Sequence, residues 1–398
     1  MNIGYIVQQF YPSSYGAGIH AFELSKELLK FGHEIHVITK GEPAQEPYEC
    51  FKSIHIHRIL TAHHLPYYGA INPFLLWHYG RDLLQKLNPD IVIGHGFEAS
   101  LYFKIKKHIP FIYKAAGTIG FQAQRERLTW RDAVGNIVFP VLGQLEKTAA
   151  RTADCVIAVS ESIKQELSVT YKVPPQLIHR IYNGVNTSRF HPAQHCAPIK
   201  QELELNSQKI ILFVGRLSPI KGPHLLIQAI PRIIKKFPDV IFLFIGEGPL
   251  SSYLHQMVRD LNIARFVKFL GFISNSEMPK YFALADLCVM PSLYEPFGLV
   301  ALESLASGTP LLASNRGGLG ELHQILEAFP LLNPITPLSI SEKIIALLRN
   351  NEALKSLGKK GRELVCEHFS WRTCAEKTNE LLEKISRKRK KFKGFEIF

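Results

Sequence analysis

The chain has 398 residues, more than twice the size of a usual single domain, so two domains are expected. Its composition, 46% hydrophobic and 20% charged, is that of an ordinary globular protein and excludes a mainly disordered chain. The formal charge of +13 predicts an anionic partner, which can be a phosphorylated small molecule, an acidic membrane surface or nucleic acid.

The six cysteines form no C-x-x-C pair, and several lie inside apolar, strand-like runs. This usage is typical of buried thiols in a reducing compartment. The N-terminus lacks the basic segment and apolar run of a signal peptide, and no uninterrupted apolar segment approaches the ~20 residues that cross a bilayer. We therefore expect a cytoplasmic protein that can still bind peripherally to the inner face of a membrane.

Short apolar runs alternate with helical patterns in the first half of the chain. Residues 3–10 predict a strand, and the helical spacing of apolar residues in 20–32 predicts a helix that ends at Gly32. Further strands are predicted at residues 34–39, 90–95, 110–115 and 154–160. Strands separated by helices favour βαβ units and a parallel sheet.

The pattern loosens over residues 191–206, which are rich in Pro, His, Gln and Asn, and restarts after them. We expect a first domain over 1–190, an interdomain linker over 191–206 and a second domain over 207–370. The strands predicted in the second domain are 209–215, 240–246, 267–272, 287–292 and 310–314. The predicted fold class is α/β, with two Rossmann-like doubly wound domains.

Residues 371–398 are predicted to form a C-terminal helix that packs back on the first domain and ends in a basic tail. The tail, EKISRKRKKFKGFEIF, has two interpretations: a frayed helix end, or an electrostatic contact with anionic lipid.

The first glycine-rich segment contains Gly16, Gly18 and Ala21 in a G-x-G-x-x-A spacing. It formally matches a dinucleotide fingerprint, but YPSSY separates it from the strand and no acidic residue clearly ends a second strand about 20 residues on. Gly16 and Gly18 then form either a turn that lets the backbone approach a bound group, or a plain strand-to-helix turn. An NAD-dependent dehydrogenase would depend on these glycines alone.

Two cations follow the first strand of the second domain. In FVGRLSPIKG, Arg216 and Lys221 precede a helix whose first residue is expected to be Pro223. This arrangement suits a diphosphate, because a guanidinium binds two oxygens in a fork and an ammonium acts as a point charge. The alternative is a pair of solvated loop charges.

Two glutamates flank a predicted helix start in PSLYEPFGLVALESLASGTP, residues 291–310. The amide groups near Phe297, Gly298 and Leu299 are expected to face an anion. Glu303 lies about 9 Å further along the helix, at ~1.5 Å per residue, where it can accept hydrogen bonds from ribose hydroxyls. Glu295 precedes the helix, on the side where a sugar beyond the diphosphate would lie. Two solvated carboxylates are the alternative.

Together these segments resemble, nearly end to end, the retaining nucleotide-sugar glycosyltransferases of GT-B fold called family four. The matching segments are GAGIHAFELSKELLKFGHEIHVIT, VSESIKQEL, IYNGVNTSRF, ILFVGRLSPIKG, IGEGP, MPSLYEPFGLVALESLASGTPLLASNRGGLGE and HFSWRTCAEK. The resemblance implies catalysis in a cleft between two facing domains. It also implies a diphosphate held by Arg216 and Lys221, ribose held by Glu303, and donor-sugar hydroxyls met by Glu295 and the Phe297–Gly298 backbone.

The sequence departs from the family pattern at two places. Family members usually have His-Gly after the fourth strand of the first domain, whereas this chain has Ala116 in YKAAGT. His95, at the end of a predicted strand, could partly substitute as a catalytic group or could be a hydrogen-bonded strand-end histidine. The second departure is GGLGE, Gly317 to Glu321, in place of GGIPE.

The expected reaction moves a hexose-type sugar from a nucleotide-diphosphate sugar, UDP- or GDP-linked, to a hydroxyl of a carbohydrate or lipid-linked acceptor. No D-x-D motif occurs, so Arg216, Lys221 and the helix dipole are expected to stabilise the leaving diphosphate without a metal or other cofactor. Retention is implied by the family. We expect no nucleic-acid partner.

Two alternative functions and one candidate lipid-binding surface are also consistent with the sequence. A sugar-nucleotide 2-epimerase of the same fold would not need the E-x7-E segment, and a catalytically weakened sugar-nucleotide-binding protein is supported by Ala116 alone. Residues 128–147, with the upstream cations Lys104, Lys106 and Lys107, form either a basic, aromatic surface for anionic lipid or a buried helix bent at Pro140.

Overall fold

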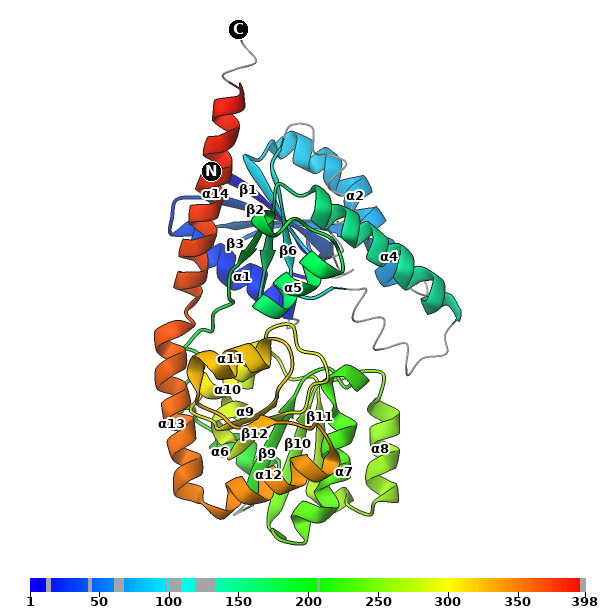
Figure 1. Ribbon diagram of the computed structural model, residues 1–398, viewed down its shortest axis with the longest axis vertical. Coiled ribbons are helices and arrows are strands. Elements are labelled where there is room, and N and C mark those ends of the chain that lie inside the picture. The colour runs from blue at the N-terminus through cyan, green and yellow to red at the C-terminus, as the bar shows by residue number, and fades with distance from the viewer. Residues whose placement is uncertain are drawn as a thin grey trace. The chain divides into compact units, whose positions relative to one another are not determined.

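Two mainly parallel β-sheets organise the computed structural model of the chain. The structure describes residues 1–11, 16–41, 45–60, 68–96, 99, 109–118, 133–205 and 208–393. The chain divides into a first unit, Met1–Asn183 with Trp371–Phe398, and a second unit, Gly184–Ser370, and each sheet belongs to one of them (Figure 1).

The sheet of the first unit has the strand order β3-β4-β2-β1-β5-β6-β7-β8, in which β3 alone is antiparallel to its neighbour. Its strands are β1 (Asn2–Ile6), β2 (Glu34–Gly41), β3 (Tyr48–Phe51), β4 (Ile54–Leu60), β5 (Ile91–His95), β6 (Phe111–Ala115), β7 (Cys155–Ala158) and β8 (Ile178–Arg180). Its helices are α1 (Gly16–Leu29), α2 (Tyr68–Leu87), α4 (Ala133–Thr152), α5 (Glu161–Val169) and α14 (Trp371–Lys393). The strand order reverses between β1 and β5, which is where a doubly wound sheet binds ligands at its carboxyl edge.

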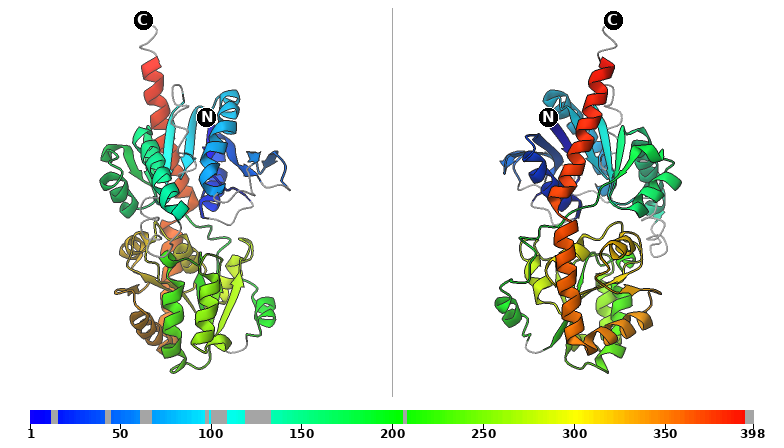
Figure 2. Two further views of the ribbon diagram at one scale, coloured as in Figure 1. Left: turned by 90° about the vertical axis from the view of Figure 1, so that its right-hand side faces the viewer. Right: turned by 60° about the vertical axis from the view of Figure 1, so that its left-hand side comes forward.

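Helix α14 returns to the first unit and packs against α1 (Figure 2). The ring of Trp371, its first residue, contacts the ring of His20 at 5.2 Å between centroids. Further along, Asn379 Oδ1 lies 2.6 Å from His33 Nε2. The helix runs to Lys393, well into the basic tail.

The sheet of the second unit is parallel throughout, with the order β11-β10-β9-β12-β13-β14. Its strands are β9 (Lys209–Val214), β10 (Val240–Ile245), β11 (Val267–Gly271), β12 (Leu287–Met290), β13 (Leu311–Ser314) and β14 (Leu331–Leu332). Its helices are α6 (Ala197–Glu202), α7 (Pro223–Ile234), α8 (Ser251–Asp260), α9 (Met278–Leu284), α10 (Leu299–Ala306), α11 (Gly318–Leu326), α12 (Pro337–Arg349) and α13 (Asn351–His368). Here the strand order reverses between β9 and β12.

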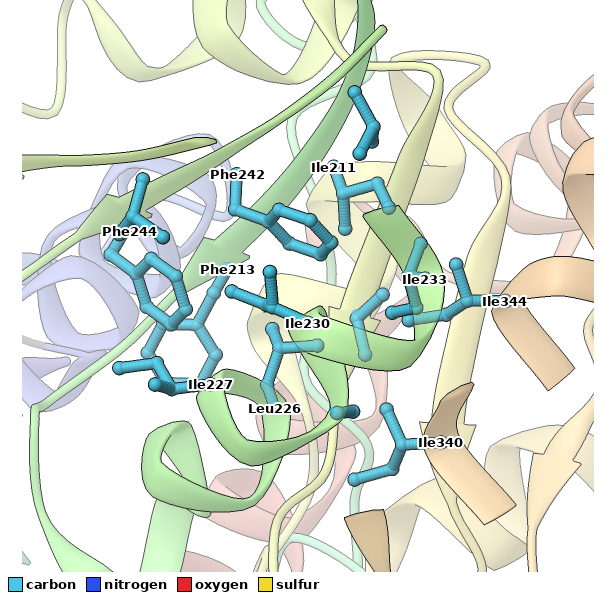
Figure 3. Close-up of a cluster of buried hydrophobic side chains, with 14 of the residues drawn as sticks. Ile211, Phe213, Leu226, Ile227, Ile230, Ile233, Phe242, Phe244, Ile340 and Ile344 are labelled. Atoms are coloured by element: carbon cyan, nitrogen blue, oxygen red, sulfur yellow. The ribbon is translucent and has the colours of Figure 1, made fainter. Parts of the chain in front are cut away.

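Strands β9 and β10 are almost continuously apolar because helices cover both faces of this sheet. On one face, Phe213 and Phe244 lie against Ile227 and Ile230 of α7 (Figure 3). Helices α8 and α12 complete that side of the core, while α9, α10 and α11 pack against β9 and β13. The rigid core fixes the strand ends from which the functional loops leave.

The division between the units, after Asn183, precedes the linker that we expected at 191–206. Part of that segment forms α6, and the ring of Phe190 packs on Phe282 of α9 at 5.9 Å. A bridge between Val185 and Ser370 holds both ends of the second unit together. These local contacts explain why residues that look like a loose linker belong to the second unit.

Candidate functional site

The loops that follow β9 and β12 meet at the point where the strand order of the second unit reverses. The backbone N–H groups of Leu293 and Tyr294 both donate to the carbonyl oxygen of Ile220, at 2.7 and 3.2 Å. Adjacent parallel strands place their carboxyl ends at one edge, so the two loops form a single polar surface there.

Gly222 lets these two loops approach closely. It has φ +70° and caps the N-terminus of α7, whose first residue is Pro223 as predicted. A Cβ atom at position 222 would lie 2.2 Å from the carbonyl oxygen of Pro291. Only glycine combines the left-handed backbone with this contact.

Lys221 and Glu295 form an ion pair across the two loops. The distance between Lys221 Nζ and Glu295 Oε2 is 2.8 Å, and Ser292 Oγ donates to the same carboxylate oxygen at 3.3 Å. The side chains are 24% and 10% exposed, so the pair is partly shielded from water but reachable. The sequence suggested contacts with different parts of a donor, whereas the structure brings these two groups together.

Arg216 is exposed and follows Gly215 at the end of β9. The loop that carries Arg216 makes close backbone contacts with the loop after β10. A Cβ atom at Gly246 would lie 2.1 Å from the carbonyl oxygen of Gly215, and one at Gly248 would lie 2.5 Å from that of Leu217. The Leu217 N–H also donates to the Glu247 carbonyl at 2.9 Å. This packing fixes the loop that presents the guanidinium.

The Phe297–Gly298 step is held against the start of α11. Gly298 caps α10 with φ +109°, and a Cβ atom there would lie 2.8 Å from Leu319 Cδ2. A Cβ atom at Gly318 would lie 2.4 Å from the Cα of Phe297, and the Gly318 N–H donates to the Glu295 carbonyl at 2.9 Å. The GGLGE segment therefore supports the backbone around Glu295.

Helix α10 begins at Leu299 and carries Glu303 in its second turn. Burial raises the pKa of Glu303 to about 7, and the nearby Arg189 guanidinium opposes this rise. Arg189 is itself held by hydrogen bonds to the carbonyl and the side chain of Asn275. Sequence reasoning missed Arg189, because it lies more than 100 residues before the carboxylate that it influences.

His95 lies at the end of β5 in the first unit and is 3% exposed. Burial, and then the charge of Lys114, lower its pKa to about 3, so the imidazole is neutral at neutral pH. The centroids of the His95 and His20 rings lie 5.4 Å apart. Among the described residues, the buried His95 Nε2, His20 Nε2 and Lys114 Nζ atoms have no hydrogen-bond partner.

Sequence reasoning also missed His20 and Lys114. Lys114 is fully buried, and burial lowers its pKa to about 8. The signal was present, because FIYKA places a lysine inside an apolar strand, where cations are rare. Ala116 follows this strand and is partly exposed.

Gly16 and Gly18 lie in the first turn of α1, Gly16 exposed and Gly18 buried, so they form the helix start and not the loop before it. Of the predicted lipid-binding surface, Lys104, Lys106 and Lys107 and residues 128–132 lie outside the described residues. Pro140 lies inside the helix α4. Within the described part of the chain, no helix is long and apolar enough to span a bilayer.

Comparison with known proteins identifies the family of the chain. Residues 15–189 match the model of Glycosyltransferase Family 4, and residues 197–364 match that of the glycosyl transferases group 1. The chain therefore belongs to the group 1 glycosyltransferases of the family 4 type, and it has the GT-B fold, as predicted. It is a glycosyltransferase.

Two relatives match over most of their length. An uncharacterized glycosyltransferase of Methanocaldococcus jannaschii is 28% identical over 95% of this chain and 97% of its own. The N-acetyl-alpha-D-glucosaminyl L-malate synthase of Bacillus anthracis is 28% identical over 90% of this chain and 91% of its own.

Two solved structures share the fold. Sucrose-phosphate synthase from Thermosynechococcus elongatus has a TM-score of 0.80 at 23% identity, covering 96% of this chain and 98% of that one. HepE of Anabaena, in complex with UDP-glucose, has a TM-score of 0.76 at 20% identity, covering 96% of this chain and 100% of that one.

Proposed function

We propose that this glycosyltransferase moves a hexose-type sugar from a UDP- or GDP-linked donor to a hydroxyl acceptor with retention of configuration. The observation that carries the proposal is the Lys221–Glu295 pair, 2.8 Å long, at the point where the strand order reverses. A cation and a carboxylate lie side by side there. A sugar diphosphate needs both, one for the phosphate oxygens and one for the sugar hydroxyls.

Arg216 and Lys221 would hold the diphosphate, with the N-terminus of α10 as a further source of positive potential. Glu303 would accept hydrogen bonds from the ribose hydroxyls. HepE of Anabaena, with UDP and glucose, and starch synthase IV of Arabidopsis thaliana, with ADP, bind nucleotides on the same fold, which supports a nucleotide-sugar donor for this chain.

In the proposed reaction the bond between the anomeric carbon and the leaving phosphate oxygen breaks as the acceptor oxygen bonds to that carbon on the same face. The acceptor proton passes to the leaving phosphate. Arg216 and Lys221 stabilise the negative charge that develops on the diphosphate, which lowers the barrier without a resident metal ion. Glu295 and the Phe297–Gly298 backbone orient the sugar.

A single observation, Ala116, favours a second candidate function. An alanine stands where the family usually has a histidine, so the catalytically weakened sugar-nucleotide-binding protein stays a specific alternative. His95 is too deeply buried to contact a sugar without a rearrangement of its surroundings. We therefore propose that the donor-binding residues of the second unit carry out the transfer. His95 would act on the site only indirectly, without contacting the sugar.

We propose a carbohydrate or lipid-linked acceptor in polysaccharide-type biosynthesis, and a cytoplasmic site of action that includes the anionic inner face of a membrane. The charge of +13 supports contact with anionic lipid. Nucleic acid is not among the proposed partners.

A panel of radiolabelled sugar nucleotides, incubated with the protein with and without lipid extract, tests the proposal. We expect label to move from one donor into a product, and we expect the Arg216→Ala variant to lose most of this transfer. A donor that binds without turnover would favour the binding protein, and return of the label as a 2-epimer of the donor would favour the epimerase.

A further inference from the structure

Three buried basic side chains gather on one face of the first unit's sheet. His95 of β5 and Lys114 of β6 are partners in the strand register, so they project from the same face. His20 reaches this face from α1, and its ring centroid lies 5.4 Å from that of His95. The ring of Trp371, from α14, packs on the His20 ring and closes the cluster on that side. All four residues belong to the first unit, whereas the donor-binding loops belong to the second.

Each of the three basic side chains has a buried nitrogen atom that lacks a hydrogen-bond acceptor. Among the residues that the structure describes, His20 Nε2, His95 Nε2 and Lys114 Nζ have no partner. Tyr5 Oη lies 3.3 Å from His20 Nδ1. When this hydroxyl donates to Nδ1, the imidazole carries its proton on Nε2, which is then an unused donor beside the ammonium. Buried polar groups without a protein partner usually bind a water molecule or an ion.

The charge of Lys114 favours an ion over water. Burial lowers the pKa of Lys114 to about 8, so the ammonium form still predominates at pH 7. Within the described ranges of the chain, no carboxylate accepts a hydrogen bond from this ammonium. A buried cation without a counter-charge is strongly unfavourable, and water supplies no counter-charge. Burial lowers the pKa of both imidazoles as well, so His20 and His95 are neutral at neutral pH and can donate N–H groups to an anion.

We propose that His20, His95 and Lys114 bind one small oxyanion, a carboxylate or a phosphate group. Lys114 supplies the balancing charge, and each imidazole donates from Nε2. The position fits a ligand, because the strand order of this sheet reverses beside β5, where doubly wound sheets bind ligands at the carboxyl edge.

An oxyanion is smaller than a sugar ring, and partly exposed backbone lies close to the cluster. Gly96 directly follows His95, and Ala116 follows Lys114 by two residues. The long, flexible side chain of Lys114 lets its ammonium move toward a bound oxygen. The oxyanion is either free in solution or a charged group of the acceptor, and its binding does not depend on glycosyl transfer.

Nuclear magnetic resonance of the histidine rings in the full chain, titrated with inorganic phosphate or acetate, tests the site. The variants His20→Gln and His95→Gln assign the two ring signals, and sodium chloride at equal ionic strength controls for the effect of salt. We expect saturable shifts of both signals, and an affinity about tenfold lower in Lys114→Met, which removes a charge-assisted hydrogen bond. Methionine keeps the apolar part of the lysine side chain, so this variant is expected to fold, which far-UV circular dichroism checks.

The matched control is Lys86→Met, at an exposed lysine on α2 of the same unit, which should respond to the oxyanions like the unchanged protein. Arg216→Ala, in the second unit, should leave the histidine shifts intact, which separates this site from the proposed diphosphate site. The proposal would be overturned if the His20 and His95 signals respond to neither oxyanion, or respond equally in folded Lys114→Met.

The titration contains neither donor nor acceptor, so its failure is distinguishable from a failure of glycosyl transfer. A transfer assay at saturating donor then identifies the source of the oxyanion. Competition between the binding oxyanion and the acceptor would show that the acceptor carries the charged group. Binding without competition would show that the site holds a free anion.

Discussion

Lys221 reaches the Glu295 carboxylate from the neighbouring loop, so each of these groups sets the charge that the other presents to a ligand. A diphosphate binding beside the pair gains the ammonium charge but also meets a carboxylate. Removal of the lysine therefore has two effects, because it deletes a cation and leaves Glu295 uncompensated. Arg216 lies on the exposed side of the same loop.

We predict that Arg216→Ala weakens binding of the free nucleoside diphosphate by about 1.5–3 kcal/mol, the contribution of a charge-assisted hydrogen bond. Lys221→Ala should weaken it more, and the double variant Lys221→Ala/Glu295→Gln should recover part of the loss. Calorimetry measures all three. Arg232→Ala, at the far end of α7, is the matched control. Unchanged affinity in both single variants would place the diphosphate elsewhere.

The two carboxylates should separate in steady-state kinetics. Glu303 is placed on ribose in the ground state and the transition state alike, so Glu303→Gln should raise the donor KM. Glu295 is placed beside a sugar ring that gains positive charge, so Glu295→Gln should chiefly lower kcat. The reverse assignment would exchange the roles of the two residues.

The pKa of Glu303, raised to about 7, predicts a pH dependence of donor binding. Ribose hydroxyls donate to the carboxylate, so the ionised form binds and affinity should rise as the pH passes upward through 7. For a pKa of about 7 the ionised fraction changes about tenfold between pH 6 and pH 8. Glu303→Gln removes this group but leaves the titration of the phosphate, so the difference between the two profiles isolates Glu303. Parallel profiles would contradict the ribose assignment.

At the scale of elements, the two functional loops depend on glycines that allow backbone to touch backbone. We predict that Gly222→Ala destabilises the second unit by the cost of a left-handed alanine, about 1–2 kcal/mol, plus about 1–3 kcal/mol for the contact with Pro291. Gly308 has a similar φ of +74°, but a Cβ atom there would meet its nearest neighbour at an ordinary 3.4 Å. Gly308→Ala should therefore cost only the free energy of a left-handed alanine.

Differential scanning calorimetry compares the two variants. For a unit of this size each kcal/mol lowers the melting temperature by about 2–4 °C, so Gly222→Ala should melt several degrees below Gly308→Ala. Gly222→Ala should also bind nucleoside diphosphate more weakly, since the loops after β9 and β12 separate. Equal melting temperatures would show that the close contact at Gly222 is relaxed at little cost.

Periodicity predicted most strands of both sheets within a few residues, because runs such as KIILFV and VIFLFI are buried on both faces and read as continuous apolar segments. The strands β3, β4, β8 and β14 were not predicted. Pro223 at the start of α7 and Gly308 after α10 also follow local rules for helix ends. The segment 191–206 lies inside the second unit, Gly184–Ser370, and its polar composition does not reveal that the preceding Phe190 packs on Phe282.

The site was only partly predictable. Charged residues in loops and at a helix start are visible in the sequence, and they include Arg216, Lys221, Glu295 and Glu303. Pairing between Lys221 and Glu295 depends on the strand order, which spacing along the chain does not give. The same holds for His95 and Lys114, which become neighbours only through the register of β5 and β6.

At the scale of the whole molecule, the charge of +13 predicts attraction to anionic surfaces. We predict co-sedimentation with phosphatidylglycerol vesicles at low salt and release at high salt, since each basic residue near the lipid contributes on the order of 1 kcal/mol that salt screens. Phosphatidylcholine vesicles are the neutral control. Absence of binding at low salt would favour an acceptor that is free in solution.

The most direct test of glycosyl transfer is nuclear magnetic resonance of a reaction with the donor and acceptor that the labelled panel identifies. The account predicts one nucleoside diphosphate released for each sugar transferred, and a product whose anomeric configuration equals that of the donor. An inverted anomer would contradict the proposed same-face reaction. A sugar nucleotide changed at carbon 2 without diphosphate release would contradict transfer itself.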